Sequence, residues 1–299
     1  MKVGVIMGGV SSEREISLMS GKEVLKNLNS DNYEEIIPIV INSKSEVIEK
    51  VKGIDFAFIA LHGKFGEDGT IQGLLESLEI PYSGCNVLTS AVCMNKGLTK
   101  RIIQSVGIKT APWITVKSVE EINYDKIREF DYPVFIKPNN GGSSVATFCV
   151  KYERDVEAAV LEGLKYDNEV IIEKYISGEE ITSFVLNGEV FPTVAIKAKK
   201  GEFFDYSSKY DKGGAEEVPV LLEEGLQGMV NEISERIWDV LCCKSYCRID
   251  MIVENGIPYV LEVNTLPGMT TASIIPKSAK AKGIEFSELL DKIIEFSLV

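Results

Sequence analysis

The sequence predicts an α/β protein that begins with a parallel-sheet domain and continues into a larger α+β region. Residues 2–7 form a short apolar run that stops at Gly8-Gly9, and a helical pattern follows over residues 16–28. Strand, glycine turn and helix in this order are the first unit of a parallel α/β sheet. In the last third of the chain, two alternating apolar runs flank Asn255-Gly256 instead. That pattern predicts an antiparallel hairpin.

Composition narrows the class of protein. With 299 residues, 45% of them hydrophobic, the chain can bury a core in two or three compact units. A formal net charge of -13 argues against general binding to nucleic acid or to anionic membranes. The N-terminal apolar run is too short for a secretory signal, and no run of about 18 apolar residues follows it. We expect a cytoplasmic protein that contacts neither membrane nor nucleic acid.

Cysteine and histidine usage limits the chemistry further. The six cysteines lie mostly in apolar segments without a C-x-x-C pair, so buried free thiols are expected at Cys85, Cys93, Cys149, Cys242, Cys243 and Cys247. The chain has one histidine, His62. A histidine-based zinc site, or a Ser-His-Asp triad built elsewhere in the chain, is therefore not expected.

The parallel domain offers candidate ligand-binding groups where its strands end. Ser12 and Glu15 have the spacing of a capping box, which leaves Glu13 in the first helical turn, facing the space above the strand. No G-x-G-x-x-G follows the first strand, so a nicotinamide cofactor is not expected. Further apolar runs cover residues 36–41 and 56–61, and the second ends in His62-Gly63. Open α/β sheets bind ligands at this edge, although a glycine-rich turn with an incidental histidine fits equally well.

Two lysines and a glycine-rich loop indicate a phosphate site. Lys137 interrupts an apolar run that ends at residues 139–144, Asn-Asn-Gly-Gly-Ser-Ser, before a strand expected at residues 145–150. Backbone N–H groups and hydroxyls of such a loop can hold phosphates, although the loop is not a Walker motif. Lys96, at the start of a helical pattern, would by itself be interpreted as a solvated lysine.

The predicted hairpin carries the strongest signal. Pairing across Asn255-Gly256 brings Asp250 near Glu262 and Asn264, whose side chains leave the same face of one strand. Three hard oxygen ligands favour magnesium over zinc, although a polar strand face would look similar. Arg248 on the same face, and Gly268 after it, suit an anionic phosphate intermediate.

Two further stretches are less specific. The apolar run at residues 170–176 ends in charge at Glu173-Lys174, which could contact an adenine edge or simply end a strand. Residues 199–217 form a polar stretch containing several aromatic residues, longer than the roughly 12 to 15 residues of most irregular loops. We interpret it as a lid that excludes water, with a disordered linker as the alternative.

Arg248-Ile-Asp250 followed by Glu262-Val-Asn264-Thr-Leu-Pro-Gly268 resembles the metal-binding signature of the ATP-grasp carboxylate-amine ligases, and within them of the D-alanine:D-alanine ligase family. The resemblance covers essentially the whole chain. It implies a parallel α/β domain over residues 1–85, followed by a two-subdomain ATP-grasp fold. Its subdomains would cover residues 86–176 and 177–299, with the lid at 199–217. The implied reaction condenses two D-alanines through an acylphosphate to D-alanyl-D-alanine for peptidoglycan synthesis, using ATP and two Mg²⁺ (or Mn²⁺).

The resemblance also implies roles for individual residues. Catalysis and substrate orientation would involve Glu13, Ser143, Tyr210, Arg248, Gly268 and Ser273, with His62 and Ile274 lining the substrate site. ATP would contact Lys96, Lys137, Ser144, Glu173, Lys174, Tyr175, Ile176, Glu180 and Lys209, and the metal ligands would be Asp250, Glu262 and Asn264. The sequence departs from the family pattern at Ala146, where many members carry glycine. A ligase for another acid and amine, or an inactive nucleotide-binding module, remain alternatives, and a homodimer is left open.

Overall fold

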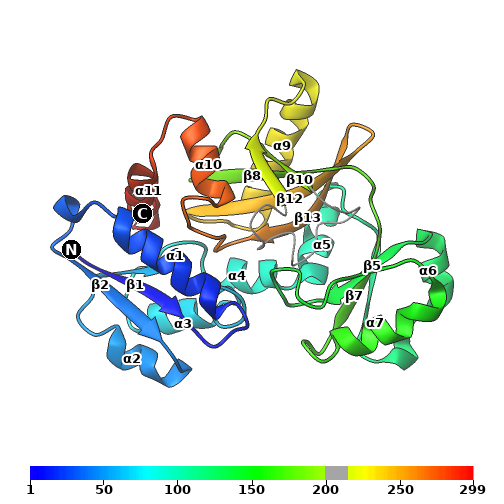
Figure 1. Cartoon of the computed structure of the whole chain (residues 1–299), viewed down its shortest axis with the longest axis horizontal. Coiled ribbons are helices and arrows are strands. Elements are labelled where there is room, and N and C mark those ends of the chain that lie inside the picture. Colours follow the sequence, from blue (N-terminus) through cyan, green and yellow to red (C-terminus); the bar gives the residue numbers. More distant parts are fainter. Residues whose placement is uncertain (199–214, 299) are drawn as a thin grey trace.

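The computed structural model describes residues 1–198 and 215–298. Its N-terminal domain and its central sheet lie at opposite ends of the molecule, with the C-terminal sheet between them (Figure 1). Short 3₁₀ turns occur at Ser30–Asn32, Lys44–Glu46, Val119–Glu121 and Glu153–Asp155. None of the helices in the described ranges is long and apolar enough to cross a bilayer.

The N-terminal domain is the predicted parallel α/β unit. Strands β1 (Lys2–Gly8), β2 (Glu35–Ile41) and β3 (Phe56–Ile59) form a parallel sheet in the order β2-β1-β3. Its helices are α1 (Arg14–Asn27), α2 (Val47–Lys50) and α3 (Thr70–Ser77). The core of this domain also includes residues from α10 (Ile274–Ala281) and α11 (Phe286–Ser297), so the end of the chain packs against its beginning.

A four-stranded antiparallel sheet forms the central region. It consists of β4 (Trp113–Val116), β5 (Val134–Pro138), β6 (Phe148–Val150) and β7 (Val170–Lys174), in the order β4-β7-β5-β6. Helices α6 (Tyr124–Phe130) and α7 (Val156–Gly163) accompany it. The strand expected from residue 145 begins only at Phe148, because Ser143, Ser144 and Ala146 have positive φ of 52°, 56° and 53°. Left-handed residues interrupt an extended strand.

The C-terminal sheet holds β8 (Glu179–Leu186), β10 (Val194–Ala198), β11 (Ala215–Pro219), β12 (Tyr246–Glu254) and β13 (Ile257–Asn264) in the order β11-β10-β8-β12-β13, and β9 (Glu189–Val190) pairs with β8. All of these pairs are antiparallel. Helices α4 (Val87–Met94), α5 (Lys96–Ser105) and α9 (Glu224–Val240) pack on this sheet through one shared core. Helices α4 and α5 belong to residues 86–176 but pack in the core of the C-terminal sheet. The domain limits expected at residues 86–176 and 177–299 remain a prediction.

The hairpin of β12 and β13 has the predicted turn, and a register shift between Asp250 and Met251 sets how its site residues face each other. Asn255 and Gly256 both have positive φ, 52° and 75°, as a type I′ turn requires. Asp250 faces Glu262, and Arg248 faces Asn264. The prediction of a lid over residues 199–217 is wrong at its end, because residues 215–217 pair with β10. Lys209 and Tyr210 lie outside the described residues.

Four of the cysteines form a buried group of free thiols behind β12. This thiol cluster comprises Cys85, Cys93, Cys243 and Cys247. The expectation of burial is wrong for Cys242, which is exposed after α9, and Cys149 is half-buried.

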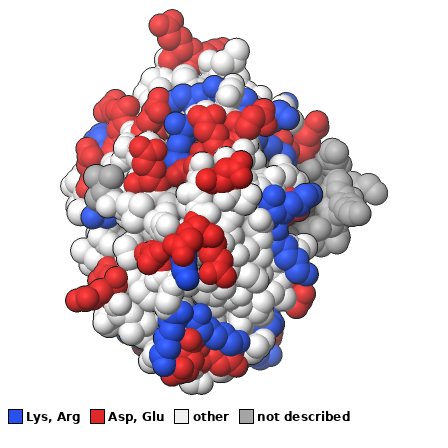
Figure 2. All heavy atoms as spheres, turned by 90° about the vertical axis from the view of Figure 1, so that its left-hand side faces the viewer, with Lys and Arg blue, Asp and Glu red and all other residues white. Residues whose placement is uncertain are grey.

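The face that carries the N-terminal domain shows acidic and basic side chains interspersed, with no continuous basic surface (Figure 2).

Candidate functional site

Two cavities adjoin where the three regions of the chain meet. The first cavity, about 360 Å³, lies between the N-terminal domain and the C-terminal sheet, and the second, about 440 Å³, lies between the central and C-terminal sheets. Both are lined by Ser143, Glu180, Asp250 and Glu262. These four residues therefore lie where a molecule in one cavity would meet a molecule in the other.

Glu13 is directed into the first cavity by the turn that precedes α1. The capping box expected from Ser12 and Glu15 is wrong, since Glu13 itself is the N-cap and no side chain caps the helix. Instead the hydroxyl of Ser11 accepts from the Glu13 N–H at 3.2 Å and donates to the His62 carbonyl at 2.6 Å. The hydroxyl of Ser143, on the glycine-rich loop, donates to the Glu13 carboxylate. Burial, and then the nearby carboxylate of Glu67, raise the pKa of Glu13.

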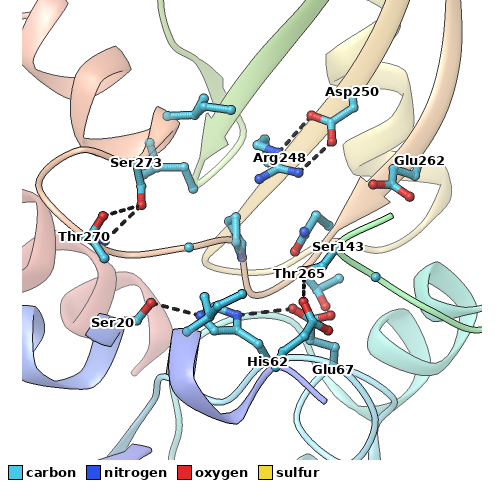
Figure 3. A pocket seen from close by; sticks show the side chains of 18 of the residues that line it. Ser20, His62, Glu67, Ser143, Arg248, Asp250, Glu262, Thr265, Thr270 and Ser273 are labelled. Carbon is cyan, nitrogen blue, oxygen red and sulfur yellow. Dashed lines mark hydrogen bonds and ion pairs between the residues drawn. The ribbon is translucent and has the colours of Figure 1, made fainter. Parts of the chain in front are cut away.

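His62 joins the parallel sheet to the loop after β13 (Figure 3). Its Nδ1 lies 3.1 Å from the Leu266 carbonyl oxygen and 3.5 Å from Glu67 Oε1, and its Nε2 lies 3.0 Å from Ser20 Oγ. A carbonyl only accepts, so Nδ1 carries the proton in the neutral ring. Sequence reasoning missed Glu67, although it lies in the glycine-rich segment after His62 and lines the cavity.

Arg248 and Asp250 form a bidentate pair on β12. The Arg248 Nε and Nη2 atoms lie 2.8 and 2.6 Å from the two Asp250 oxygens (Figure 3). Thr182 donates to Asp250 Oδ1 at 2.7 Å. A carboxylate offers about four acceptor positions, so three accepted bonds leave Asp250 one position for a cation. Glu262, which faces Asp250, is 26% exposed and points to both cavities.

Asn264 completes an oxygen-only set with Asp250 and Glu262. Its side-chain oxygen accepts from the Leu266 N–H at 3.2 Å and it lines the first cavity. Hard oxygen ligands beside a cavity are the environment that Mg²⁺ and Mn²⁺ prefer. The residues present therefore fit the predicted divalent cation.

Lys96 and Lys137 line the second cavity, and Lys100 contacts the same carboxylate as Lys137. The Nζ of Lys96 donates to the Gly141 carbonyl at 2.5 Å and lies 3.2 Å from Glu262 Oε2. The Glu173 carboxylate forms ion pairs with the other two lysines. Lys137 Nζ lies 2.5 Å from Glu173 Oε1, and Lys100 Nζ lies 2.9 Å from Glu173 Oε2. Although burial alone would raise it, the charges of Lys100 and Lys137 bring the pKa of Glu173 to about 2. Sequence reasoning missed Lys100, which lies one helical turn after Lys96.

The glycine-rich loop is anchored from outside the cavity. Asp167 accepts from the backbone N–H and the side-chain amide of Asn140, at 2.7 and 2.9 Å. The loop then places Ser144 in the second cavity with Tyr175 and Ile176, whereas Lys174 is not among the residues lining the two cavities. The Lys174 N–H donates to the Pro112 carbonyl at 2.9 Å instead.

The start of α10 forms the far wall of the first cavity. Ser273 is the N-cap residue of this helix but does not cap it, because its hydroxyl lies 2.8 Å from Thr270 Oγ1 (Figure 3). Gly268 and Ile274 line the same wall. A Cβ at Gly268 would come within 3.2 Å of Ser273 Oγ, so glycine allows the loop to approach the helix. An ion pair missed by sequence reasoning, Lys277 to Glu217 at 2.8 Å, closes this wall.

Comparisons with known proteins agree with this geometry. A family profile described as D-ala D-ala ligase C-terminus matches residues 102–295, and one described as D-ala D-ala ligase N-terminus matches residues 2–50 and 42–85. The chain belongs to the D-alanine–D-alanine ligase family. D-alanine–D-alanine ligase B of Clostridium perfringens is 56% identical over 299 residues, covering 100% of this chain and 98% of that protein.

Solved structures of the family have the same architecture. The D-alanine–D-alanine ligase of Bacillus anthracis complexed with ATP has a TM-score of 0.91 and 47% identity, covering 100% of this chain and 97% of that one. The VanG D-Ala:D-Ser ligase of Enterococcus faecalis has a TM-score of 0.85 and 32% identity, covering 99% of each chain. The predicted family, and the α/β domain followed by an ATP-grasp fold, are confirmed.

Proposed function

We propose that the first cavity binds two molecules of D-alanine, that the second binds ATP, and that the residues shared by both join the D-alanines into D-alanyl-D-alanine. The chain is an ATP-dependent ligase that serves peptidoglycan synthesis. The observation that carries the assignment of the cavities is the shared wall. Asp250 and Glu262 line both cavities, beside Arg248 in the first and Lys96 in the second.

The nucleotide site follows from charge and shape. Lys96 and Lys137 reach the second cavity with the glycine-rich loop, and ammonium groups with backbone N–H donors bind phosphate oxygens. Glu173, Tyr175, Ile176 and Glu180 line the remaining wall and are the proposed contacts of adenine and ribose. Asp250, Glu262 and Asn264 hold Mg²⁺ or Mn²⁺. The bound ion supplies positive charge that neutralises the phosphate oxygens.

The D-alanine sites follow from the first cavity. The Glu13 carboxylate, oriented by Ser143, is the proposed partner of the first amino group, with His62 behind it. Ser273 and the N–H of Ile274 are proposed to hold the carboxylate of the second D-alanine, because the first N–H groups of a helix attract anions. This placement directs the second amino group toward the carboxyl carbon of the first substrate.

The reaction needs activation because a free carboxylate is a poor acyl donor. The carboxylate of the first D-alanine takes up the γ-phosphoryl group, giving an acylphosphate and ADP. The amine of the second D-alanine then attacks the acyl carbon, and phosphate leaves. Arg248 and the Gly268 N–H are proposed to stabilise the oxyanion formed in between, a type of contact worth roughly 3 to 4 kcal/mol.

Three further proposals concern Tyr210 and Lys209, the cellular compartment and self-association. Tyr210 is proposed to take part in catalysis and Lys209 to contact ATP. Free thiols and the use of ATP support a cytoplasmic enzyme, since the cytosol keeps cysteines reduced. Self-association into a homodimer is a further proposal, which the mass of the purified protein in solution would test.

Phosphate release tests the proposed function most directly. The purified chain, Mg²⁺ and ATP are combined with D-alanine, D-serine, D-lactate or L-alanine, singly and in pairs, and products are identified by mass spectrometry. We expect phosphate release with D-alanine alone and D-alanyl-D-alanine as its product. Greater turnover with a different acid and amine would reassign the first cavity. Absence of turnover despite ATP binding would indicate an inactive nucleotide-binding module.

A further inference from the structure

Lys100 is a buried cation to which the reaction assigns no role. It is 1% exposed and does not belong to the lining of either cavity. Its Nζ lies 2.9 Å from Glu173 Oε2, 2.7 Å from Thr110 Oγ1 and 3.3 Å from the Ala111 carbonyl oxygen. Thr110 and Ala111 accept hydrogen bonds from the ammonium, and Glu173 is its ion-pair partner. Lys100 is therefore engaged by protein groups and lies outside the lining that a nucleotide in the second cavity would contact.

The surroundings hold Lys100 in this position. The Thr110 hydroxyl donates its proton to the Val260 carbonyl at 2.7 Å, so it can only accept from Lys100. Val260 is on β13, the strand that carries Glu262, and Glu173 is on β7 of the central sheet. The indole of Trp113 lies 5.5 Å from the Lys100 ammonium, within the range of a cation–π contact. Lys100 thus joins the two sheets that enclose the second cavity.

The net charge around Glu173 depends on its ion pair with Lys100. Glu173, Lys100 and Lys137 together carry one excess positive charge, and of the two lysines only Lys137 lines the cavity. If Glu173 had Lys137 as its single counter-ion, moving Lys137 toward a phosphate would leave a buried carboxylate uncompensated, which is costly. With Lys100 in place, the carboxylate keeps a partner while Lys137 contacts the nucleotide.

We propose that Lys100 is a positioning residue, the permanent counter-ion of Glu173, which releases Lys137 to bind the phosphates of ATP. The inference rests on the proposed function, because it takes the second cavity to be the nucleotide site. The two lysines respond differently to burial. Burial lowers the pKa of Lys100 although Glu173 acts against it, whereas Glu173 raises the Lys137 pKa above its ordinary value despite burial.

The first test compares ligands that differ in charge but share the adenosine part. Calorimetry measures binding of Mg-ATP, Mg-ADP and adenosine to the wild type and to Lys100→Met. We expect the variant to bind ATP about tenfold more weakly or worse, ADP less so, and adenosine within about twofold of the wild type. KM for D-alanine should not change. The exposed Lys109→Met is the matched control and should bind all three ligands as the wild type does.

The second test removes the carboxylate together with its counter-ion. In Lys100→Met with Glu173→Gln, Lys137 again carries the one excess charge, so the ratio of ATP affinity to adenosine affinity should return to within about threefold of the wild-type ratio. The ratio cancels any loss of the contact that Glu173 makes with the adenosine part, which both ligands share. A role of Lys100 in packing alone predicts no such recovery. The double variant decides the question by itself if Lys100→Met does not fold.

Three results would overturn the inference. They are unchanged ATP affinity in Lys100→Met, an equal loss for ATP and adenosine, or a double variant whose ratio of ATP affinity to adenosine affinity stays as low as that of Lys100→Met. Failure of the wild type to bind ATP would instead contradict the proposed function, and this inference with it. The two failures are therefore distinguishable from the wild-type measurement.

Discussion

The walls of the two cavities differ in the contacts that join the N-terminal domain and the central sheet to the rest of the site. Around the first cavity, hydrogen bonds join Glu13 to Ser143 and His62 to Leu266, and the Lys277–Glu217 ion pair closes only the far wall. Around the second, the joining contacts are buried ion pairs, as between Glu173 and its two lysines. Hydrogen bonds fix position with little excess charge, which suits a zwitterionic amino acid. An ion-pair cluster with one surplus cation suits a polyphosphate.

The largest expected effect is at Glu262, which belongs to both cavities. Replacing it by Gln removes an anionic metal ligand and the counter-ion 3.2 Å from Lys96. Glu262→Gln should lower kcat by about a thousandfold or more while the protein stays folded. Phosphate release measured across a Mg²⁺ titration checks this, with circular dichroism as the folding control. Glu254→Gln, at the far end of the same hairpin, should keep wild-type turnover; normal activity in Glu262→Gln would remove the metal assignment.

The next effect is expected in the second cavity alone. Lys137→Met removes its surplus cation, so the dissociation constant of ATP should rise by about ten- to a hundredfold, while KM for D-alanine changes little. Lys96→Met should act in the same direction. Isothermal titration calorimetry measures the first quantity and steady-state kinetics the second. The exposed Lys126→Met of the same region is the control. Equal effects on both substrates would show that the cavities do not divide the substrates as proposed.

A smaller effect is expected from one hydrogen bond across the first cavity. Ser143→Ala removes the donor to Glu13 and leaves the loop backbone able to keep its conformation, since serine and alanine face the same constraint at positive φ. We expect kcat/KM for D-alanine to fall by about ten- to a hundredfold, with ATP affinity unchanged. A loss confined to ATP binding would show that Ser143 acts only through the second cavity, which it also lines.

The smallest expected effect concerns stability and pH. Folding raises the pKa of Glu13, so this group favours the folded state most below its unfolded pKa, and that contribution is lost as pH rises through the folded pKa. Glu13→Gln should therefore raise Tm slightly, by about 1 to 3 °C near pH 8, and the gain should shrink toward about pH 4, while D-alanine binding is lost. Thermal unfolding across this pH range checks it. Glu15→Gln, exposed on the same helix, should show no such trend.

The sequence predicted best where chemistry is encoded locally. The Asn255-Gly256 turn sets the register from Glu254 to Met251, but counting on from there would place Asp250 opposite Leu261. A register shift between Asp250 and Met251, which the sequence does not indicate, brings Asp250 opposite Glu262. The Ser12 and Glu15 capping box was wrong because the neighbouring Ser11 binds the His62 carbonyl, a partner from a different strand end. The strand before Phe148 was predicted too long because the residue types in Ser-Ser-Val-Ala do not indicate that Ser143, Ser144 and Ala146 adopt positive φ.

Long-range ion pairs were the least predictable part of the site. A lysine on an amphipathic helix is usually interpreted as solvated, and the partner of Lys100 lies on another sheet, far along the chain. Glu67 was missed for a related reason. The sequence shows that Glu67 follows His62, but the electrostatic interaction between Glu67 and Glu13 depends on how α1 begins. In both cases, tertiary packing decides which charges become neighbours.

The thiol cluster behind β12 has an experimental consequence. Burial helps to raise the pKa of the Cys85, Cys93 and Cys247 thiols, so they react with a disulfide reagent only after the core opens. Exposed Cys242 reacts without such opening. Because Cys247 lies on β12 and the other three thiols pack against it in one core, the slow phase of labelling measures how often this core opens around β12. Ligands bound in the two cavities should lengthen that phase, so a colorimetric assay on the unmodified chain can rank ligands by how firmly they hold β12 in place.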